Sequence, residues 1–224
     1  MLHDFPFDPS YGYDDSALRA IRPPVEVEGF ADFWNATYAE TLALPLCLQL
    51  DDNGLPHRSH RVWTVQFATL GGYRVGGWLL EPRDHPPLSL LVQGHGYGGR
   101  DSIDALIPQR AAVLLVCAPG FNRSARADLP DQAAAHVVHG IGHRDTYLLR
   151  FCVAALWSAG SVLRERHPSL PLHYAGGSFG GGLGALAMPW DTRITAGFLE
   201  VPTFGHHPLR LRCPCVGSGE AAGA

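Results

Sequence analysis

The chain has 224 residues, of which 46% are hydrophobic and 17% charged, and its formal net charge is −4. This length and composition predict a single globular domain over residues 1–224 with a sizeable buried core. The negative charge gives no reason to expect nucleic acid or an anionic membrane as a partner. All 17 basic residues are arginines, which excludes lysine-based catalysis.

The cysteines and the first residues bear on where the protein acts. Five cysteines are scattered along the chain, mostly inside apolar runs, and their odd number argues against a disulfide framework. The segment 1–6 lacks the basic start and the apolar core of a signal peptide. No apolar run is long enough to span a bilayer. The sequence therefore predicts a cytoplasmic protein.

In chain order, a polar arm is followed by alternating strands and helices. Residues 1–25 are rich in Pro, Asp and Tyr and predict an irregular N-terminal arm. The elements expected after it are a helix at 29–43, a β-hairpin at 61–80, strands covered on both faces at 88–92 and 111–117, a helix at 145–166 capped by Asp145, a strand at 172–175, a helix at 181–188 and a strand at 194–201. A leading antiparallel hairpin followed by this alternation predicts an α/β fold with a mostly parallel sheet.

The sequence Gly176-Gly177-Ser178-Phe179-Gly180 lies between the strand at 172–175 and the helix that follows it. A G-x-S-x-G pattern in a strand–turn–helix setting is typical of a nucleophile elbow, in which a sharp turn holds a serine hydroxyl above the sheet edge. The glycines avoid clashes with the adjoining strand and helix, and the helix N-terminus favours developing negative charge. We therefore expect Ser178 to be a catalytic nucleophile, and a simple packing turn is the alternative.

A second glycine-rich stretch, residues 94–99, follows the first strand of the parallel series. In α/β-hydrolases the loop at this place supplies one amide of the oxyanion hole, and the residue after the nucleophile supplies the other. The predicted donors are the backbone N–H groups of Tyr97 and Phe179. A plain glycine-rich turn is the alternative here.

Several stretches taken together resemble carbohydrate esterase family seven, the acetyl xylan esterase and cephalosporin C deacetylase group of α/β-hydrolases. The matching stretches, between about residues 25 and 202, are Gly29–Trp34, Gly76–Pro82, His95–Gly99, His139–Ile141 with Tyr147 and Arg150, Gly176–Gly181, and Val201–Pro202. The resemblance implies an α/β-hydrolase fold and hydrolysis of acetyl esters on short xylo-oligosaccharides or similar small substrates. It also implies that no cofactor is needed and that the protein forms a homo-oligomer, frequently a hexamer.

The chain departs from that family's pattern at two places. An Arg-Gly-Gln-Gly stretch is usual after the second parallel strand, where this chain has 118–123, and a Gln is usual where it has Phe179. A backbone amide does not depend on its own side chain, so the oxyanion hole is expected to survive the second change. The pocket lining and the oligomer contacts are the features that these changes can alter.

The end of the chain predicts a hydrolase-type fold that is incomplete at its C-terminus. In the hydrolase order an acid and a histidine follow later strands, and one more strand–helix–strand unit takes roughly 30 residues. After Val201 the chain has 23 residues. We therefore expect a truncated chain that keeps the nucleophile and lacks the base. We expect such a chain to be catalytically impaired and to have an exposed apolar edge where further strands would pack.

Other residues are candidates for the missing base. His207 and His206 follow the strand at 194–201, and a parallel arrangement beside the nucleophile strand would bring them to the edge that carries Ser178. An acid such as Glu200 would orient the ring. The alternative is that both are surface histidines. Asp191 follows the elbow helix too closely to be the acid and is expected to cap a turn.

A dinucleotide site is a competing interpretation of the same region. Gly180-x-Gly182-x-x-Ala185 opens a helix, and Glu200 follows 20 residues after the first glycine, as a dinucleotide-binding fingerprint requires. Residues 176–179, however, separate the strand from that glycine, and no second nucleotide-binding half follows.

A metal site is the other competing interpretation. His136, His139 and His143 have metal-like spacing, and Cys213 and Cys215 could add ligands with the two later histidines. Glycines at 140 and 142 interrupt any helix that would align the three rings. We therefore expect structural histidines, no metal and no cofactor.

Overall fold

The structure is a computed structural model, and it describes residues 6, 8–52, 54–103, 107–210 and 215–223. The chain divides into two compact units, one that ends at Phe33 and one that begins at Trp34. Within the arm predicted to be irregular, α1 (Asp15–Ala20) is a short helix. The Asp14 carboxylate accepts a hydrogen bond from the N–H of Ala17 and caps it. The Pro- and Tyr-rich composition around it concealed this local signal.

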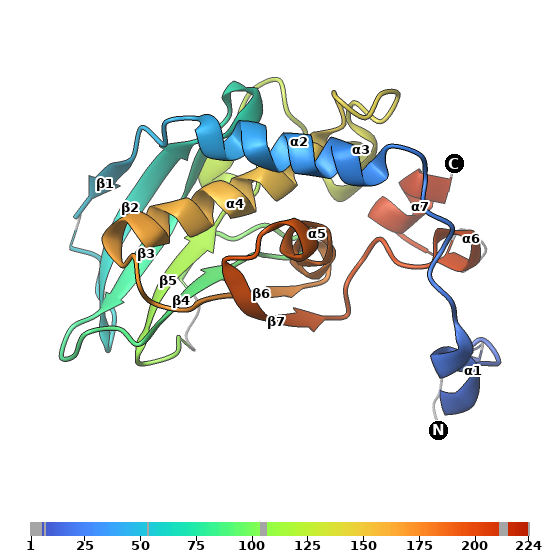
Figure 1. Cartoon of the computed structure of the whole chain (residues 1–224), viewed down its shortest axis with the longest axis horizontal. Helices are drawn as coiled ribbons and strands as arrows, with labels where there is room; N and C mark the ends of the chain where they lie inside the picture. The colour runs from blue at the N-terminus through green and yellow to red at the C-terminus, as the bar shows by residue number, and fades with distance from the viewer. Residues whose placement is uncertain (1–5, 7, 53, 104–106, 211–214, 224) are drawn as a thin grey trace. The chain divides into compact units, whose positions relative to one another are not determined.

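The second unit is built on a sheet that has the strand order β1-β2-β3-β5-β4-β6-β7 among the described residues (Figure 1). The strands are β1 (Gln49–Asp51), β2 (His60–Ala68), β3 (Arg74–Pro82), β4 (Ser89–Gln93), β5 (Ala111–Val116), β6 (Leu172–Gly177) and β7 (Ile194–Glu200). β1, β2, β3 and β5 are joined by antiparallel pairing, whereas β5, β4, β6 and β7 run parallel. This confirms the predicted α/β-hydrolase-type fold, a mostly parallel sheet with an antiparallel N-terminal hairpin.

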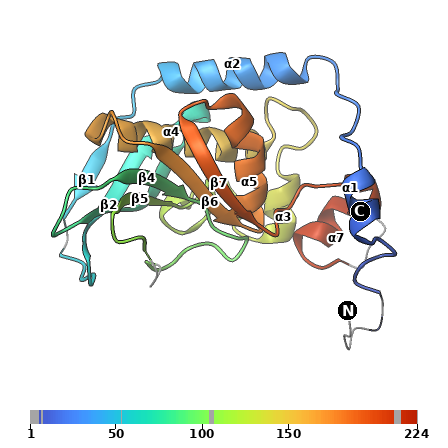
Figure 2. The ribbon, with the colours of Figure 1, turned by 60° about the horizontal axis from the view of Figure 1, so that its bottom comes forward.

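Helices cover one face of this sheet. The remaining helices are α2 (Phe30–Ala43), α3 (Ala133–Val138), α4 (Leu148–Arg166), α5 (Phe179–Ala187), α6 (His207–Arg210) and α7 (Ser218–Gly223). α4 lies along the sheet with α5 beside it (Figure 2). The Trp34 and Tyr38 rings of α2 meet the Trp157 ring of α4 edge-on, with centroids 6.1 and 5.1 Å apart. No helix in the described ranges has the length and apolarity needed to cross a membrane.

The start of α4 differs from the prediction. The helix begins at Leu148 after Tyr147, so the prediction that Asp145 caps it is wrong. The N–H groups of residues 146 and 147 donate to the His143 carbonyl, and that of Leu148 donates to the His139 carbonyl at 3.0 Å. A preceding turn therefore satisfies these donors. The Asp145 carboxylate instead lies 3.4 Å from the Arg150 guanidinium.

Of the two strands predicted to be covered on both faces, one is buried as predicted and the other is partly exposed. Every residue of β5 is buried, as predicted, but β4 buries Leu90 and Val92 and leaves Leu91 partly exposed. Leu91 packs against a cluster on the other face of the sheet, formed by Val62, Trp78, Leu80, Ala111, Val113, Leu115 and Cys117. The loop residues Leu55 and Ile107 pack on the same cluster. Loops thus take part in covering this face, and they cover it less fully than a helix does.

β7 forms one edge of the sheet, and most of its side chains are exposed. Phe198 is 67% exposed, and Val201, just after the strand, is 76% exposed. The apolar edge predicted for a chain that ends its sheet here is therefore present. An uncovered edge of this kind favours pairing with another strand or association between chains.

Candidate active site

The two glycine-rich stretches meet at a topological switch point of the sheet. β4 has β5 on one side and β6 on the other, and in open α/β sheets ligands bind beyond the carboxyl ends of such strands. The loop at 94–99 leaves the carboxyl end of β4, and Ser178 follows the carboxyl end of β6. A Cβ atom built on Gly96 would lie 3.7 Å from the Cβ of Ser178. The loop backbone therefore passes directly beside the serine.

Ser178 occupies a strained position between β6 and α5. Its backbone has φ 51° and ψ −116°, a conformation that a residue with a side chain rarely adopts. The end of β7 and the loop after it hold this turn. The N–H of Ser178 donates to the Glu200 carbonyl at 2.9 Å, and the Ser178 carbonyl accepts from the N–H of Thr203 at 3.1 Å. The hydroxyl, at the partly exposed top of this turn, forms no hydrogen bond within the described part of the chain.

Two of the neighbouring glycines are required by close approach of the backbone. A Cβ on Gly176 would lie 2.7 Å from the carbonyl of Gly180, and a Cβ on Gly180 would lie 2.9 Å from the carbonyl oxygen of His95. Both distances are shorter than real Cβ contacts allow. Small residues at these positions let β6, α5 and the loop after β4 converge, which is what the motif implied.

Comparison with known families gives the family of the chain. The family model described as acetyl xylan esterase (AXE1) matches residues 17–208. The chain belongs to the acetyl xylan esterase family. A comparison with curated protein sequences gives no match.

Two solved acetyl xylan esterases have the same fold. Acetyl xylan esterase 1 from Thermoanaerobacterium sp. JW/SL YS485 is 16% identical, with a TM-score of 0.71 over 83% of this chain and 62% of that one. The acetyl xylan esterase from Paenibacillus sp. R4 is 23% identical, with a TM-score of 0.78 over 92% of this chain and 70% of that one. The chain thus spans less than two thirds of the first relative and somewhat more than two thirds of the second.

In this member of the acetyl xylan esterase family, His95 braces the loop beside Ser178. The His95 Nε2 accepts a hydrogen bond from the N–H of Ala118 at 2.9 Å, so the proton of the neutral ring is on Nδ1, which donates to the Gly96 carbonyl at 2.6 Å. The side chain is 7% exposed, and burial lowers its pKa to about 4. His95 therefore connects the loop to the end of β5 as an uncharged ring. The sequence motif contains His95 but does not reveal this role.

This burial predicts a loss of stability in acid. The unfolded chain binds a proton at His95 as the pH falls below about 6.5, whereas the folded chain resists protonation until about pH 4. The free energy of unfolding is therefore expected to fall by up to about 3 kcal/mol between pH 7 and pH 4 through this residue. Burial also lowers the pKa of His136, which acts in the same direction. Urea unfolding at a series of pH values measures the slope. The dependence of unfolding free energy on pH should become shallower in His95→Asn. An unchanged dependence would contradict the description of His95 as a buried, uncharged ring.

The segment that departs from the usual pattern, 118–123, also supports the loop. The Asn122 side-chain oxygen accepts a hydrogen bond from the N–H of Arg100 at 2.6 Å, and Asn122 itself adopts φ 44°. The Arg100 guanidinium donates to the Gly94 carbonyl at 3.0 Å. This stretch thus anchors the far end of the 94–99 loop through an asparagine side chain.

The structure brings Tyr97 and Phe179 together at this site. Their rings are stacked with centroids 4.1 Å apart, and the ring of Phe179 is fully buried. The two residues proposed as oxyanion donors from distant parts of the chain are therefore spatial neighbours.

His206 and His207 lie on the loop and short helix that follow β7. Both side chains are exposed, and His206 Nδ1 accepts a hydrogen bond from the N–H of Leu209 at 3.1 Å. Partial desolvation by neighbouring groups, and then the Arg210 charge, lowers the pKa of His207, which favours the neutral form that a base requires. Within the described residues no hydrogen bond links either ring to Ser178. The Glu200 carboxylate lies 3.6 Å from the position of a Cβ on Gly177, the residue before Ser178.

The competing dinucleotide interpretation is wrong. β6 ends at Gly177 and α5 begins at Phe179, so Gly180 and Gly182 lie inside the helix. A phosphate-binding fingerprint needs its first glycines in the turn between strand and helix, where their N–H groups are free to bind.

The spaced histidines do not assemble into a metal site in the described residues, where no group of three or more His, Cys, Asp or Glu side chains is placed to hold a metal. His136 is fully buried, and its Nε2–H donates a hydrogen bond to the Pro119 carbonyl at 2.9 Å. Cys213 lies outside the described residues.

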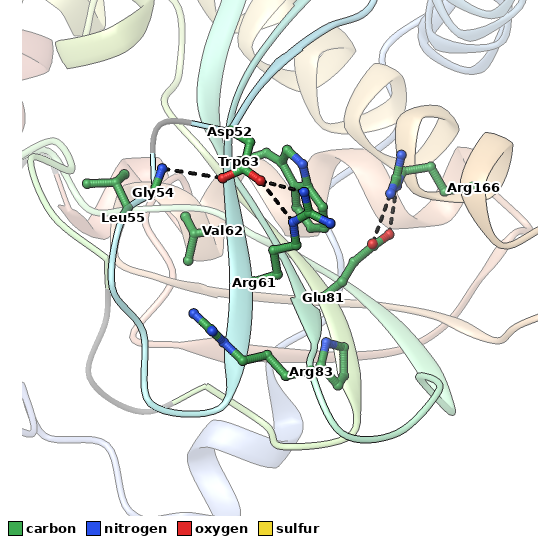
Figure 3. Close-up of a pocket in the computed structure, with 10 residues that line it drawn as sticks. Asp52, Gly54, Leu55, Arg61, Val62, Trp63, Glu81, Arg83 and Arg166 are labelled. Atoms are coloured by element: carbon green, nitrogen blue, oxygen red, sulfur yellow. Dashed lines mark hydrogen bonds and ion pairs between the residues drawn. The ribbon is translucent and has the colours of Figure 1, made fainter.

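A cavity of about 780 Å³ lies away from this site (Figure 3). It borders the start of β2 and the end of β3, which lie at the amino ends of the parallel strands, whereas Ser178 lies at their carboxyl ends. Its charged groups are largely paired, Arg61 with Asp52 and Arg166 with Glu81. The backbone geometry around Ser178, and not the size of a cavity, therefore locates the candidate active site.

Proposed function

We propose that this chain carries the nucleophile of a serine carboxylic-ester hydrolase that removes acetyl groups from short acetylated xylo-oligosaccharides or similar small esters. The observation that carries the proposal is the strained backbone of Ser178 at a strand–helix turn, directly beside the 94–99 loop. Membership of the acetyl xylan esterase family supports an acetyl ester as the substrate.

In the proposed mechanism the Ser178 hydroxyl attacks the acetyl carbonyl. The base takes the serine proton, and the N–H groups of Tyr97 and Phe179 stabilise the oxyanion. The bond between the acetyl carbon and the sugar oxygen then breaks, the base returns the proton to that oxygen, and water hydrolyses the acetyl-enzyme to acetate and free serine. His207 or His206, oriented by an acid such as Glu200, is the proposed base within this chain. No metal and no cofactor takes part in these steps.

The second candidate is a hydrolase chain without a working acid and base. The exposed edge at β7 and the exposure of both histidines favour it. Removal of one member of a catalytic triad leaves roughly 10³–10⁴-fold acceleration over water in the best-studied case. This candidate therefore predicts slow acylation of Ser178 and little turnover.

The finer parts of the proposal follow the resemblance to carbohydrate esterase family seven. They are activity on the acetyl ester of cephalosporin C and a homo-oligomeric assembly. A cytoplasmic location and the absence of nucleic acid or membrane partners are proposed from the composition and net charge instead. Size-exclusion chromatography with light scattering tests the assembly, and release of acetate from each ester tests the substrate.

A fluorophosphonate reagent tests the nucleophile. In the labelling reaction the Ser178 oxygen bonds to phosphorus, the P–F bond breaks, and fluoride and the hydroxyl proton leave. We expect peptide mass spectrometry to find the label on Ser178. We also expect 4-nitrophenyl acetate to be hydrolysed faster than 4-nitrophenyl butyrate. Labelling without turnover supports the second candidate. A folded protein that is not labelled at Ser178 refutes both.

A further inference from the structure

The rings of Tyr97 and Phe179 form a face-to-face stack across the candidate oxyanion hole. Their centroids are 4.1 Å apart and their planes are inclined by 19°. Tyr97 comes from the loop after β4, and Phe179 is the first residue of α5. The stack therefore joins two segments that are far apart in the sequence.

Backbone contacts bring the two segments together at their start, where the N–H of Gly94 donates to the Ala175 carbonyl at 2.9 Å and a Cβ on Gly180 would lie 2.9 Å from the His95 carbonyl oxygen. Within the described residues, no backbone hydrogen bond connects 96–99 with 178–181. The hydrogen bond of the His95 Nε2 ties the loop to the end of β5. Beyond residue 95, side-chain packing is thus the contact that sets how far the N–H of residue 97 lies from that of residue 179.

Further rings hold the stack from the sides. An aromatic cluster surrounds it, with ring centroids 4.7 to 6.2 Å apart, formed by His95, Tyr97, Phe121, His136, Phe179 and Phe204. These rings come from the loops after β4, β5 and β7 and from α3 and α5. Rings packed from several elements restrict sliding of the two stacked rings.

The hydroxyl of Tyr97 is not what keeps its ring in place. The Oη atom is buried and has no hydrogen-bond partner among the residues that the structure describes. A buried hydroxyl without a partner costs stability, so the ring itself makes the useful contacts. The Tyr97→Phe and Tyr97→Leu variants therefore separate the ring from the hydroxyl.

We propose that the Tyr97–Phe179 stack is a positioning device that sets the distance between the two backbone amides of the oxyanion hole. The proposal rests on the proposed function, because it needs an oxyanion at Ser178. The side chains act through the backbone and touch neither the ester carbonyl nor the nucleophile. Displacement of an amide donor by about 1 Å is enough to lower a catalytic rate by around 100-fold.

The test is the rate of fluorophosphonate labelling, because the phosphoryl oxygen occupies the oxyanion position. Phe179→Leu is expected to lower the maximal labelling rate of Ser178 about 10- to 100-fold, with little change in the half-saturating concentration of the reagent. Phe67→Leu is the matched control, since Phe67 is equally buried but lies in β2. It is expected to lower the melting temperature similarly and to leave the labelling rate unchanged.

The Tyr97 pair provides a second measurement if Phe179→Leu does not fold. Tyr97→Leu should slow labelling as Phe179→Leu does, and Tyr97→Phe, which keeps the ring, should recover most of the lost rate. The positioning role alone is overturned if the wild type is labelled and Phe179→Leu is labelled as fast as Phe67→Leu. It is likewise overturned if Tyr97→Leu is labelled as fast as Tyr97→Phe. Folded wild type without any label at Ser178 overturns the proposed function as well.

Discussion

Ser178→Gly is expected to make the protein more stable and unreactive at the same time. The backbone of Ser178 has φ 51° and ψ −116°, which costs roughly 1–3 kcal/mol for a residue that has a Cβ. Glycine adopts this conformation without strain, although it loses more entropy on folding. The free energy of unfolding should therefore rise by about 1 kcal/mol. Loss of the hydroxyl should lower acetyl-ester hydrolysis by at least about 10³-fold and abolish fluorophosphonate labelling.

Ser178→Ala is the control for this prediction. It removes the same hydroxyl but keeps the Cβ, so it should be as unreactive as the glycine variant and close to wild type in stability. Urea unfolding and labelling measured on all three proteins separate strain from chemistry. Equal stability of the alanine and glycine variants would show that the turn is not strained, and residual labelling of either would place the reactive group elsewhere.

The fold could be predicted because its signals are local and repeated. The apolar run at 111–117 identifies a strand and the alternation at 61–80 identifies a hairpin without reference to the rest of the chain, and the strand and the hairpin are both present. The cap of α4 was mispredicted because the donors before Leu148 are satisfied by the preceding turn. The partial exposure of β4 depends on which loops pack over Leu91, which no pattern within the strand reveals.

The candidate site was predictable to the extent that it depends on backbone shape. Glycines on either side of Ser178 indicate a close approach, and the structure has one. The role of His95 depends on Ala118, which is 23 residues away, and the ring stack joins residues 82 positions apart. Such pairings arise from the order of strands in the sheet. The replacement of a usual Gln by Phe179 was expected to leave the amide intact, but nothing in the motif indicated that its ring would pack on Tyr97.

Asp191→Ala is expected to destabilise the protein by about 3–5 kcal/mol. The Asp191 carboxylate is fully buried and accepts hydrogen bonds from Tyr38 at 3.0 Å and from the Arg193 guanidinium at 2.7 and 2.8 Å. Burial, and then the Asp191 charge, raises the pKa of Tyr38 to about 12. Removal of the carboxylate leaves the largely buried Arg193 without its counter-ion. The prediction that this aspartate caps a turn is confirmed, because its carboxylate accepts a hydrogen bond from the N–H of Arg193 at 3.1 Å. Through Tyr38 the same carboxylate joins α2 to the segment before β7.

Asp52→Ala is the matched control, because it breaks an ion pair with Arg61 at the surface. Exposed pairs contribute roughly 0–1 kcal/mol, so its free energy of unfolding should stay close to that of wild type. The double variant Asp191→Leu/Arg193→Met removes both buried charges and should recover much of the loss, since apolar replacements of buried pairs are frequently neutral. Urea unfolding of the wild type, Asp191→Ala, Asp52→Ala and the double variant measures these differences in unfolding free energy. Similar losses of unfolding free energy in Asp191→Ala and Asp52→Ala would mean that water reaches the buried carboxylate. The hydrogen bonds by which Asp191 joins α2 to the segment before β7 would then contribute little to stability.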